Sequence, residues 1–503
     1  MNILSKIKQY YMPEAKSPAV PKKAPIALSV SVNENAALLR EYFGGVSDLT
    51  LRVVHTRGFK DTVLVASMEG LADKELVTLS IMNRLDGFYI AENMNADMIW
   101  NELCTRVVSC SDVKTVTTID QAAELIMAGF ACVFVCGCSR ALAVGVQGYA
   151  YRSVDDPETE ILQRGSREGF VEPIKINLSL LRRRIKSPDL RLESLKVGKT
   201  LPVDVTICYL EGAAPRQLID EVKRRLEDAE LDSAFTSGCL TEYLDGTRHT
   251  LFCGVGVSER PDTVCAKLCE GKAAIIVDGT PSVLIVPHLM AENFSTLDDY
   301  SDRPYFAAIT RWFKYGAFAI SVLLPGVYAA LAGFSPEFFP NELLTRVTTS
   351  VSKTPFSVFA EVLLFTFIYE IMREAGLRLP KSLGHAVSII GGLVIGDTAV
   401  TSGFIGAPTL MIVALTVICS YVIPDLYAPI ALLRFLFIIA GGLWGIWGVT
   451  VLLCVVTLES CAKESFGVPF MLPVSPLQPF GLRDVVIRAP WRVLTRRKFE
   501  MNQ

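Results

Sequence analysis

The stretch YGAFAISVLLPGVYAALAGF, Tyr315–Phe334, holds no charged residue over twenty positions. An α-helix rises about 1.5 Å per residue, so twenty residues cover the ~30 Å hydrocarbon core of a bilayer. Two further uncharged blocks of similar length, Phe404–Pro424 and Phe435–Leu458, follow it. These three blocks predict membrane-spanning helices.

Two more apolar blocks are interrupted by acids. Pro355–Ile371 contains Glu361 and Glu370, and Leu383–Gly403 contains Asp397. The two glutamates are nine residues apart, so they lie on opposite sides of an ideal helix and cannot both face one cavity. We expect Glu370 at the membrane interface, near Arg373, and Glu361 inside the membrane.

The cations predict the orientation of these blocks, because loops rich in Lys and Arg stay in the cytosol. Arg373, Arg378 and Lys381 share one loop, and the C-terminal tail is rich in arginine. We therefore expect both termini to be cytosolic, which requires an even number of crossings, although the apolar blocks number five. Four crossings result if Leu383–Gly403 enters the membrane and returns, as backbone surrounded by protein or water can do.

That same block has small residues every four positions, a spacing that lets two helices approach closely and favours self-association. They are Gly384, Ser388, Gly392 and Gly396.

Asp397 directly follows this row of small residues. A carboxylate inside a bilayer costs about 2.5 to 3.5 kcal/mol on insertion scales and is rarely left facing lipid. We expect it to face water or ions within a symmetric ring, and Thr398, Thr401 and Glu361 are further pore or ion-facing candidates. A structural hydrogen bond to a neighbouring helix is the alternative for both acids.

The first 300 residues contain a repeat. An offset of 142 places Thr118–Gly145 on Arg260–Pro287 with seven identical positions, and it also places Met68–Asp73 on Leu210–Pro215. One offset for two separate motifs indicates a duplicated unit. Each copy has apolar strands, glycine turns and helical periodicity, which predicts two α/β subdomains.

Between the copies, Leu178, Leu181 and Ile185 have helical spacing and predict a linking helix. The run Arg182, Arg183 and Arg184 is either a solvated face or a contact with lipid headgroups, a partner or an acidic neighbour.

The predicted fold is therefore an α/β soluble region of two duplicated subdomains, followed by an all-α polytopic membrane domain. The expected parts are a flexible cytosolic tail (1–32), subdomain 1 (33–152), a linker with a helix (153–191), subdomain 2 (192–300), a transmembrane domain (301–465) and a cytosolic tail (466–503).

Composition supports a membrane protein that is not an enzyme. The chain has 503 residues, of which 51% are hydrophobic, and a mean hydropathy of +0.38. Its thirteen irregularly spaced cysteines suit a reducing compartment. We find no P-loop, dinucleotide-binding glycine motif, zinc-protease motif or serine-hydrolase motif, so we expect no catalytic residues, cofactor or metal. The net charge of -3 gives no indication of a nucleic-acid partner.

Several long motifs, in order, resemble the spore germination A-subunit family (GerA/SpoVAF). They are RGSREGFVE (164–172), NLSLLRRRIKSPDLRLE (177–193), SERPDTVCAKLCEGKAAIIVDGTPSVLIVP (258–287), EVLLFTFIYEIMREAGLRLP (361–380) and FGVPFMLPVSPLQPFGLRDVVIRAPW (466–491).

The resemblance implies a multi-pass protein of the spore inner membrane that acts in germination as part of an oligomeric cation channel. Receptor A subunits of this family work with a transporter-like B subunit and a lipoprotein C subunit, whereas SpoVAF-type members work with other membrane partners. Here GDTAV, residues 396–400, carries an acid where receptor A subunits are expected to have a neutral residue. This difference favours a SpoVAF-like member.

Overall fold

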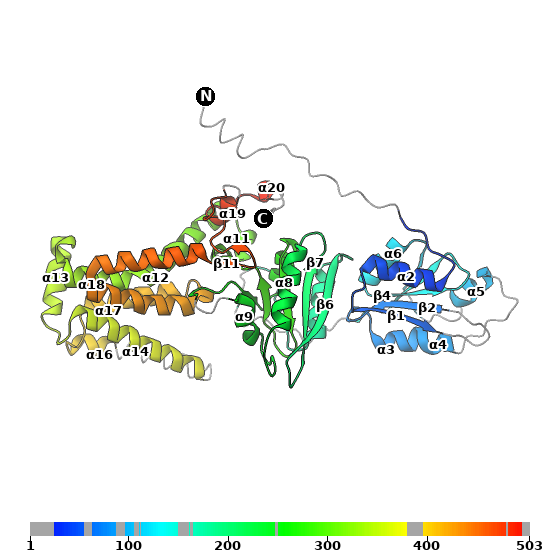
Figure 1. Cartoon of the computed structure of the whole chain (residues 1–503), viewed down its shortest axis with the longest axis horizontal. Coiled ribbons are helices and arrows are strands. Elements are labelled where there is room, and N and C mark those ends of the chain that lie inside the picture. The colour runs from blue at the N-terminus through cyan, green and yellow to red at the C-terminus, as the bar shows by residue number, and fades with distance from the viewer. Residues whose placement is uncertain are drawn as a thin grey trace, which may run out of the picture. The chain divides into compact units, whose positions relative to one another are not determined.

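A computed structural model describes most of the chain. The described residues are 25–54, 63–86, 96–104, 110, 112–148, 160, 164–246, 250–379, 396–478 and 481–494. The chain divides into an α/β unit, Met1–Arg248, Gly254–His288 and Thr495–Gln503, and a helical unit, His249–Cys253 and Leu289–Leu494. Figure 1 labels many of the elements of both units.

The first half of the α/β unit is a five-stranded antiparallel sheet in the order β1-β2-β4-β5-β3. Helices α2 and α6 bury their apolar sides on one face, and α3, η1, α4 and α5 cover the other. Alternate residues of β2 and β4 enter the two cores, as the two-residue period of a strand requires. The elements are α2 (Val32–Phe43), β1 (Leu49–Val54), β2 (Val63–Met68), α3 (Lys74–Val77), η1 (Thr78–Met82), α4 (Asn83–Asp86), α5 (Ala96–Glu102), β3 (Val113–Val116), α6 (Ile119–Met127), β4 (Phe130–Val135) and β5 (Ala141–Gly145).

The second half repeats this topology, with the strand order β6-β7-β9-β10-β8. Helices α7 and α10 pack on one face of its sheet. The elements are α7 (Ile174–Arg184), β6 (Leu190–Val197), β7 (Val203–Leu210), α8 (Arg216–Glu227), α9 (Ser237–Asp245), β8 (Gly256–Ser258), α10 (Pro261–Cys269), β9 (Ala273–Val277) and β10 (Val283–Val286).

Hydrogen bonds and turn geometry repeat at the offset of 142 that the sequence predicts. The side chain of Asn35 bonds the backbone of Ser29 in both directions, and Asn177 does the same with Val171. Gly137 and its counterpart Gly279 have φ of 83° and 86°, a conformation that favours glycine. The duplication is therefore present in the fold.

Helix α7 is the counterpart of α2 and not only a connection between subdomains. Asn177 stands on α7 where Asn35 stands on α2, and the amide of Ile174 at the start of α7 donates to Asp278 Oδ1 at 3.0 Å. The sequence comparison missed this relation, although NAALLR (35–40) on α2 and NLSLLR (177–182) on α7 are identical at four of six positions at the same offset.

Most of the described residues of the second unit lie in helices. They are η3 (Met290–Phe294), α11 (Asp298–Ser301), α12 (Pro304–Phe334), η4 (Pro336–Phe338), α13 (Asn341–Val351), α14 (Val358–Arg378), α16 (Gly396–Thr401), α17 (Ala407–Ser420), η6 (Pro424–Leu426), α18 (Tyr427–Ala462), α19 (Leu482–Val485) and α20 (Trp491–Leu494), with a short ribbon of β11 (Glu464–Ser465) and β12 (Val468–Pro469).

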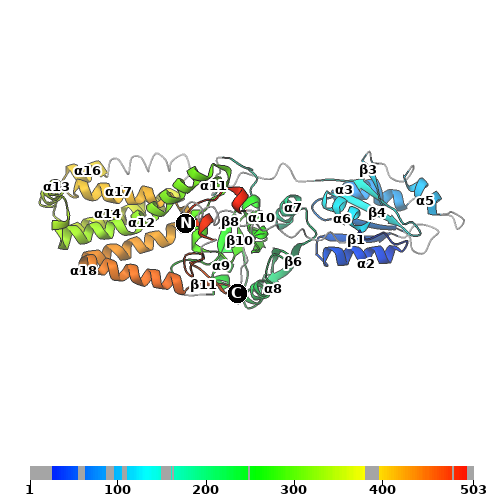
Figure 2. The same cartoon turned by 90° about the horizontal axis from the view of Figure 1, so that it is seen from above.

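Helix α18 is not one straight span. Gly445 has φ 62° and ψ −150°, which no helical residue adopts, and a Cβ placed on Gly441 would lie 3.2 Å from the side chain of Val449. Residues eight apart in a continuous helix are ~12 Å apart along its axis, so the chain folds back at Gly445. The predicted span Phe435–Leu458 thus contains a turn and parts of two limbs (Figure 2).

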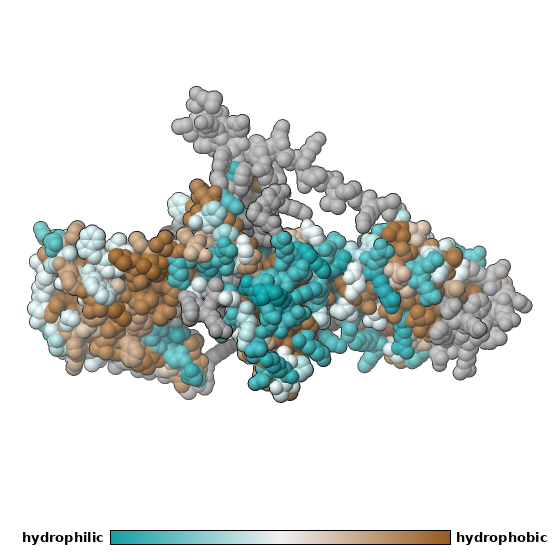
Figure 3. Space-filling model, viewed as in Figure 1, coloured by the Kyte–Doolittle hydropathy of each residue, from teal (hydrophilic) through white to brown (hydrophobic). Residues whose placement is uncertain are grey.

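By length and apolar composition, the helices Pro304–Phe334 and Pro424–Ala462 can cross a membrane, and Ala407–Ser420 is a shorter apolar helix. Thirty-nine residues would extend ~58 Å, nearly twice the hydrocarbon thickness, and the turn at Gly445 resolves that excess. Figure 3 shows hydrophobic side chains gathered over the helical unit and hydrophilic ones over α8. Of the predicted re-entrant block Leu383–Gly403, residues 383–395 lie outside the described residues, and the structure describes only 396–403.

Candidate functional site

Glu361 caps the beginning of another helix. It lies in the first turn of α14, fully buried, and its Oε2 accepts hydrogen bonds from Gly406 N at 3.2 Å and from Thr409 Oγ1 at 2.9 Å. These groups form the N-terminus of α17, whose unpaired amides and dipole favour a negative charge. Tyr328 of α12 lies 3.3 Å from Thr409 Oγ1, so three helices meet at this acid.

Asp397 is in a different environment. It lies in the first turn of α16 with an exposed side chain, and Thr398 and Thr401 are exposed as well. The hydroxyl of Thr401 donates to the Asp397 carbonyl at 2.8 Å, which occupies that hydroxyl within the helix. Of the predicted packing residues, Gly396 is buried, whereas Gly384, Ser388 and Gly392 lie outside the described residues.

Arg434 is a fully buried cation on α18. Its Nε donates to the carbonyl of Ser321 at 3.1 Å, and its Nη1 lies 3.6 Å from Glu370 Oε1. Pro325 lacks the amide that would bond the carbonyl four residues before it, which is that of Ser321. Arg434 therefore supplies the donor that α12 lacks.

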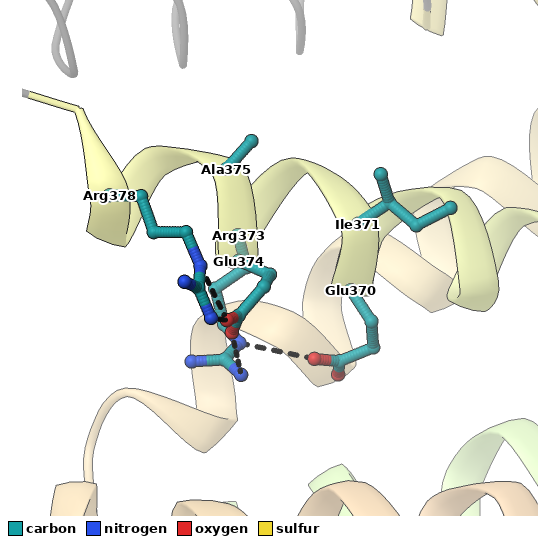
Figure 4. Close-up of a pocket in the computed structure, with 6 residues that line it drawn as sticks. All are labelled: Glu370, Ile371, Arg373, Glu374, Ala375 and Arg378. Atoms are coloured by element: carbon teal, nitrogen blue, oxygen red, sulfur yellow. Dashed lines mark hydrogen bonds and ion pairs between the residues drawn. The ribbon is translucent and has the colours of Figure 1, made fainter.

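Glu370 links this arginine to the end of α14. It accepts from Tyr427 Oη at 2.8 Å and pairs with Arg373 Nε at 3.1 Å. A shallow hollow of about 500 Å³ opens beside it, between Glu370 and Arg378 (Figure 4). The charges around the hollow are paired along the helix, with Arg378 Nη2 2.8 Å from Glu374 Oε1, which leaves it little capacity to bind an ion.

A second buried arginine fastens the C-terminal segment to the start of α12. Arg311 Nε donates to Asp299 Oδ2 at 2.8 Å, and its Nη1 pairs with Asp484 Oδ1 at 3.2 Å. Tyr300 donates to Asp484 Oδ2 at 2.9 Å, and Arg488 Nη2 donates to the Tyr300 carbonyl at 3.0 Å. The predicted C-terminal tail is thus part of the helical unit up to Leu494.

The basic run on α7 meets acidic neighbours within the α/β unit. Arg182 is 1% exposed and binds Asp48 through two bonds of 2.7 and 3.1 Å. Arg183 and Arg184 both pair with Glu168. Arg182 is consequently closed to a lipid or protein partner, while Arg183 and Arg184 remain partly exposed.

The α/β unit also has a polar hollow of about 260 Å³ beside β6 and β7. Its charged groups already bind one another: Glu193 pairs with Lys223, and Arg216 donates to Tyr209 Oη at 2.9 Å. Burial raises the pKa of Tyr209 to about 12, and the hydrogen bond to Glu193 adds to this shift. No cluster of three or more His, Cys, Asp or Glu able to hold a metal occurs within the described residues.

The sequence did not predict the buried roles of Arg434 and Arg311. Arg434 stands directly before the predicted span Phe435–Leu458, and a lone cation beside an apolar block is a signal from which a buried role can be predicted. Arg311 lies three residues before Lys314 and has no local pattern that distinguishes it from an interfacial cation. Its partner Asp484 belongs to the motif RDVVIRAPW, which resembles the family's C-terminal motif but does not by itself indicate a buried ion pair.

A family model described as "Bacillus/Clostridium GerA spore germination protein" matches residues 37–499. The chain belongs to this family. This GerA-family chain is 35% identical to "Spore germination protein KA" of Bacillus subtilis (strain 168) over 474 residues, 93% of this chain and 86% of that protein. It is 26% identical to "Stage V sporulation protein AF" of the same strain over 447 residues, 88% of this chain and 87% of that protein.

Among solved structures, the chain is similar to the N-terminal domain of the A subunit of the Bacillus megaterium spore germinant receptor GerK3. The identity is 28%, the TM-score is 0.40, and the match covers 53% of this chain and 99% of that one. The family match and the apolar helices of the chain identify it as a membrane protein of the spore germination A-subunit family. Its first half contains α/β sheets, and its second half is helical.

Proposed function

We propose that this GerA-family protein is a subunit of a homo-oligomeric ion-conducting channel in the spore inner membrane, where it promotes ion release during germination. Its termini face the cytosol, and its partners are other germination membrane proteins, either B and C receptor subunits or the partners of a SpoVAF-type member. It acts without catalysis, cofactor or metal. The exposed carboxylate of Asp397 carries this proposal.

The support comes from the contrast between two acids in the same helical unit. Glu361 is enclosed by protein and accepts two hydrogen bonds, whereas Asp397 is exposed at the beginning of α16. An acid at membrane depth is costly against lipid, so an exposed one favours water, an ion or another subunit as its neighbour. A ring of such carboxylates is a common way to select cations.

Reconstitution tests the proposal. Purified protein in liposomes should pass monovalent cations, and Asp397→Asn should change the flux or the cation selectivity. Glu337→Gln, an acid in the exposed turn η4, serves as the control and should leave both unchanged. A cation flux equal to that of empty liposomes would refute the proposal that the protein is a channel.

A non-conducting coupling subunit of the germination apparatus is the second candidate. Arg183 and Arg184 favour it, because both are partly exposed on α7 and share a single carboxylate, Glu168. For such a subunit, Asp397→Asn leaves germination intact while Arg183→Gln impairs it. A secondary transporter is the third reading, and it requires saturable, gradient-coupled uptake.

A further inference from the structure

A short segment of the α/β sequence belongs to the helical unit. Residues His249–Cys253 are part of the helical unit, although the chain before and after them belongs to the α/β unit. The described part of this segment, Thr250–Cys253, is called the strap below. It lies between α9 and β8, so subdomain 2 enters the helical unit at the strap and again after His288.

The strap is bound by the end of α18. Lys463, the first residue after that helix, donates from Nζ to Thr250 Oγ1 at 2.8 Å and to the carbonyl of Phe252. One turn earlier, Glu459 Oε1 accepts from the Leu251 amide at 3.0 Å. Three consecutive strap residues are therefore held by two side chains of one helix end.

The bond from Lys463 to Phe252 is buried and the other two are partly buried, which separates them from ordinary surface contacts. Lys463 is 5% exposed and Phe252 is 4% exposed. The rings of Phe252 and Phe470 stack with their centres 6.2 Å apart, and Lys463 Nζ lies 5.5 Å from the centre of the Phe470 ring. An ammonium in such surroundings is unfavourable without hydrogen-bond acceptors, so displacing the strap would remove the acceptors that Lys463 has there.

The other end of the strap is fixed inside the α/β unit. The Gly254 amide donates to Asp245 Oδ1, in the last residue of α9, at 2.8 Å. The carbonyl of Gly254 accepts from the His288 amide at 3.0 Å. The chain changes from one unit to the other between Cys253 and Gly254 and again after His288. The hydrogen bond between Gly254 and His288 thus holds these two points of the chain together.

We propose that the strap couples subdomain 2 to the membrane helices, with Lys463 and Glu459 as the positioning residues that hold it. A displacement of α9 or of His288 moves Gly254, because Gly254 is hydrogen-bonded to both. The strap, which directly precedes Gly254, then transmits this displacement to the end of α18. The coupling of this motion to ion flux rests on the proposed function, whereas the mechanical link itself does not.

Hydrogen–deuterium exchange of the full-length protein in lipid nanodiscs tests the link. Lys463→Met removes the donors and the charge but keeps an unbranched side chain against Phe470. We expect amides 250–252 and the last turn of α18, Glu459–Ala462, to exchange at least ~10-fold faster, because the variant loses two charged hydrogen bonds and the loss of one already corresponds to about that factor. Asp245→Ala, which changes only the α/β side, should accelerate exchange at both places as well.

Asp204→Ala on β7 is the matched control, because the side chain of that exposed acid has, among the described residues, only a distant partner, Lys196 at 3.8 Å. Faster exchange in the strap without any change in the last turn of α18, in either variant, would overturn the proposal. Ion flux is measured on the same samples in liposomes. A wild-type protein that passes no ions refutes the channel, and the exchange result still decides whether the strap is a coupling element.

Discussion

Replacing Glu361 by alanine should destabilise the helical unit strongly. The change removes the acceptor of two hydrogen bonds, 3.2 Å from Gly406 N and 2.9 Å from Thr409 Oγ1, at a fully buried position. Hydrogen bonds to a charged group contribute about 1.5 to 3 kcal/mol each, and a carboxylate at a helix N-terminus adds up to about 2 kcal/mol. Allowing for partial relaxation, we expect a loss of about 3 to 5 kcal/mol for Glu361→Ala.

Glu361→Gln should cost less, about 1 to 2 kcal/mol, because the amide oxygen still accepts both bonds and only the charge is lost. Asp397→Asn is the matched control. Its side chain is exposed, and surface substitutions usually change stability by less than ~0.5 kcal/mol.

Thermal unfolding in detergent, followed by tryptophan fluorescence, measures these differences. Of the five tryptophans, the four at 312, 444, 447 and 491 belong to the helical unit, so the signal reports mainly on it. At about 2 to 4 °C per kcal/mol for a unit of this size, Glu361→Ala should lower Tm by about 6 to 20 °C. Equal shifts for Glu361→Ala and Asp397→Asn would refute the assignment of Glu361 as the cap of α17.

Three further predictions concern other parts of the chain. Arg182→Met should destabilise the α/β unit by about 3 to 5 kcal/mol in urea denaturation, because Asp48 is left buried and unpaired, and the double change with Asp48→Leu should recover part of the loss. The hydrogen bond from Arg224, opposed by a smaller effect of burial, lowers the pKa of Glu221 from 4.5 to about 2. The ionised Glu221 therefore stabilises the fold fully above pH ~4.5, and this stabilisation is lost as the pH falls towards 2. Glu221→Gln should remove this pH dependence from a series of Tm values. Gly445→Ala should cost about 1 to 3 kcal/mol in the same fluorescence assay, because φ 62° with ψ −150° is open essentially to glycine alone.

The sequence predicted the duplication well because its signals are local. Glycine turns and alternating apolar residues depend on near neighbours, and both halves kept them at one offset. The role of α7 was missed because its match to α2 is short: four identical positions in NAALLR (35–40) and NLSLLR (177–182), followed on α7 by a basic run that is typical of a linker. The buried asparagines Asn35 and Asn177, which bond backbone six residues away, show the relation in the structure. The turn in α18 was missed for a similar reason: Gly445 lies in an apolar run whose composition fits one span as well as two limbs.

The candidate site was predicted less completely, because burial depends on partners far along the chain. Glu361 and Asp397 look alike in sequence, because each is an acid inside an apolar block. Their environments differ because Glu361 meets Gly406, forty-five residues later, at the start of another helix. Arg434 likewise gains its role from a carbonyl that Pro325 leaves unpaired 113 residues earlier in the chain at Ser321.

The two acids are nevertheless connected through the backbone. The amides of Phe404 and Ile405 donate to the carbonyl of Ala399 at 2.9 and 3.2 Å, which binds the end of α16 to the residues directly before Gly406. Glu361 holds the Gly406 amide, so it fixes the start of α17 and, through these bonds, the helix that carries Asp397. A buried carboxylate can therefore determine where an exposed one stands, and the loss of Glu361 should disturb any flux that depends on Asp397.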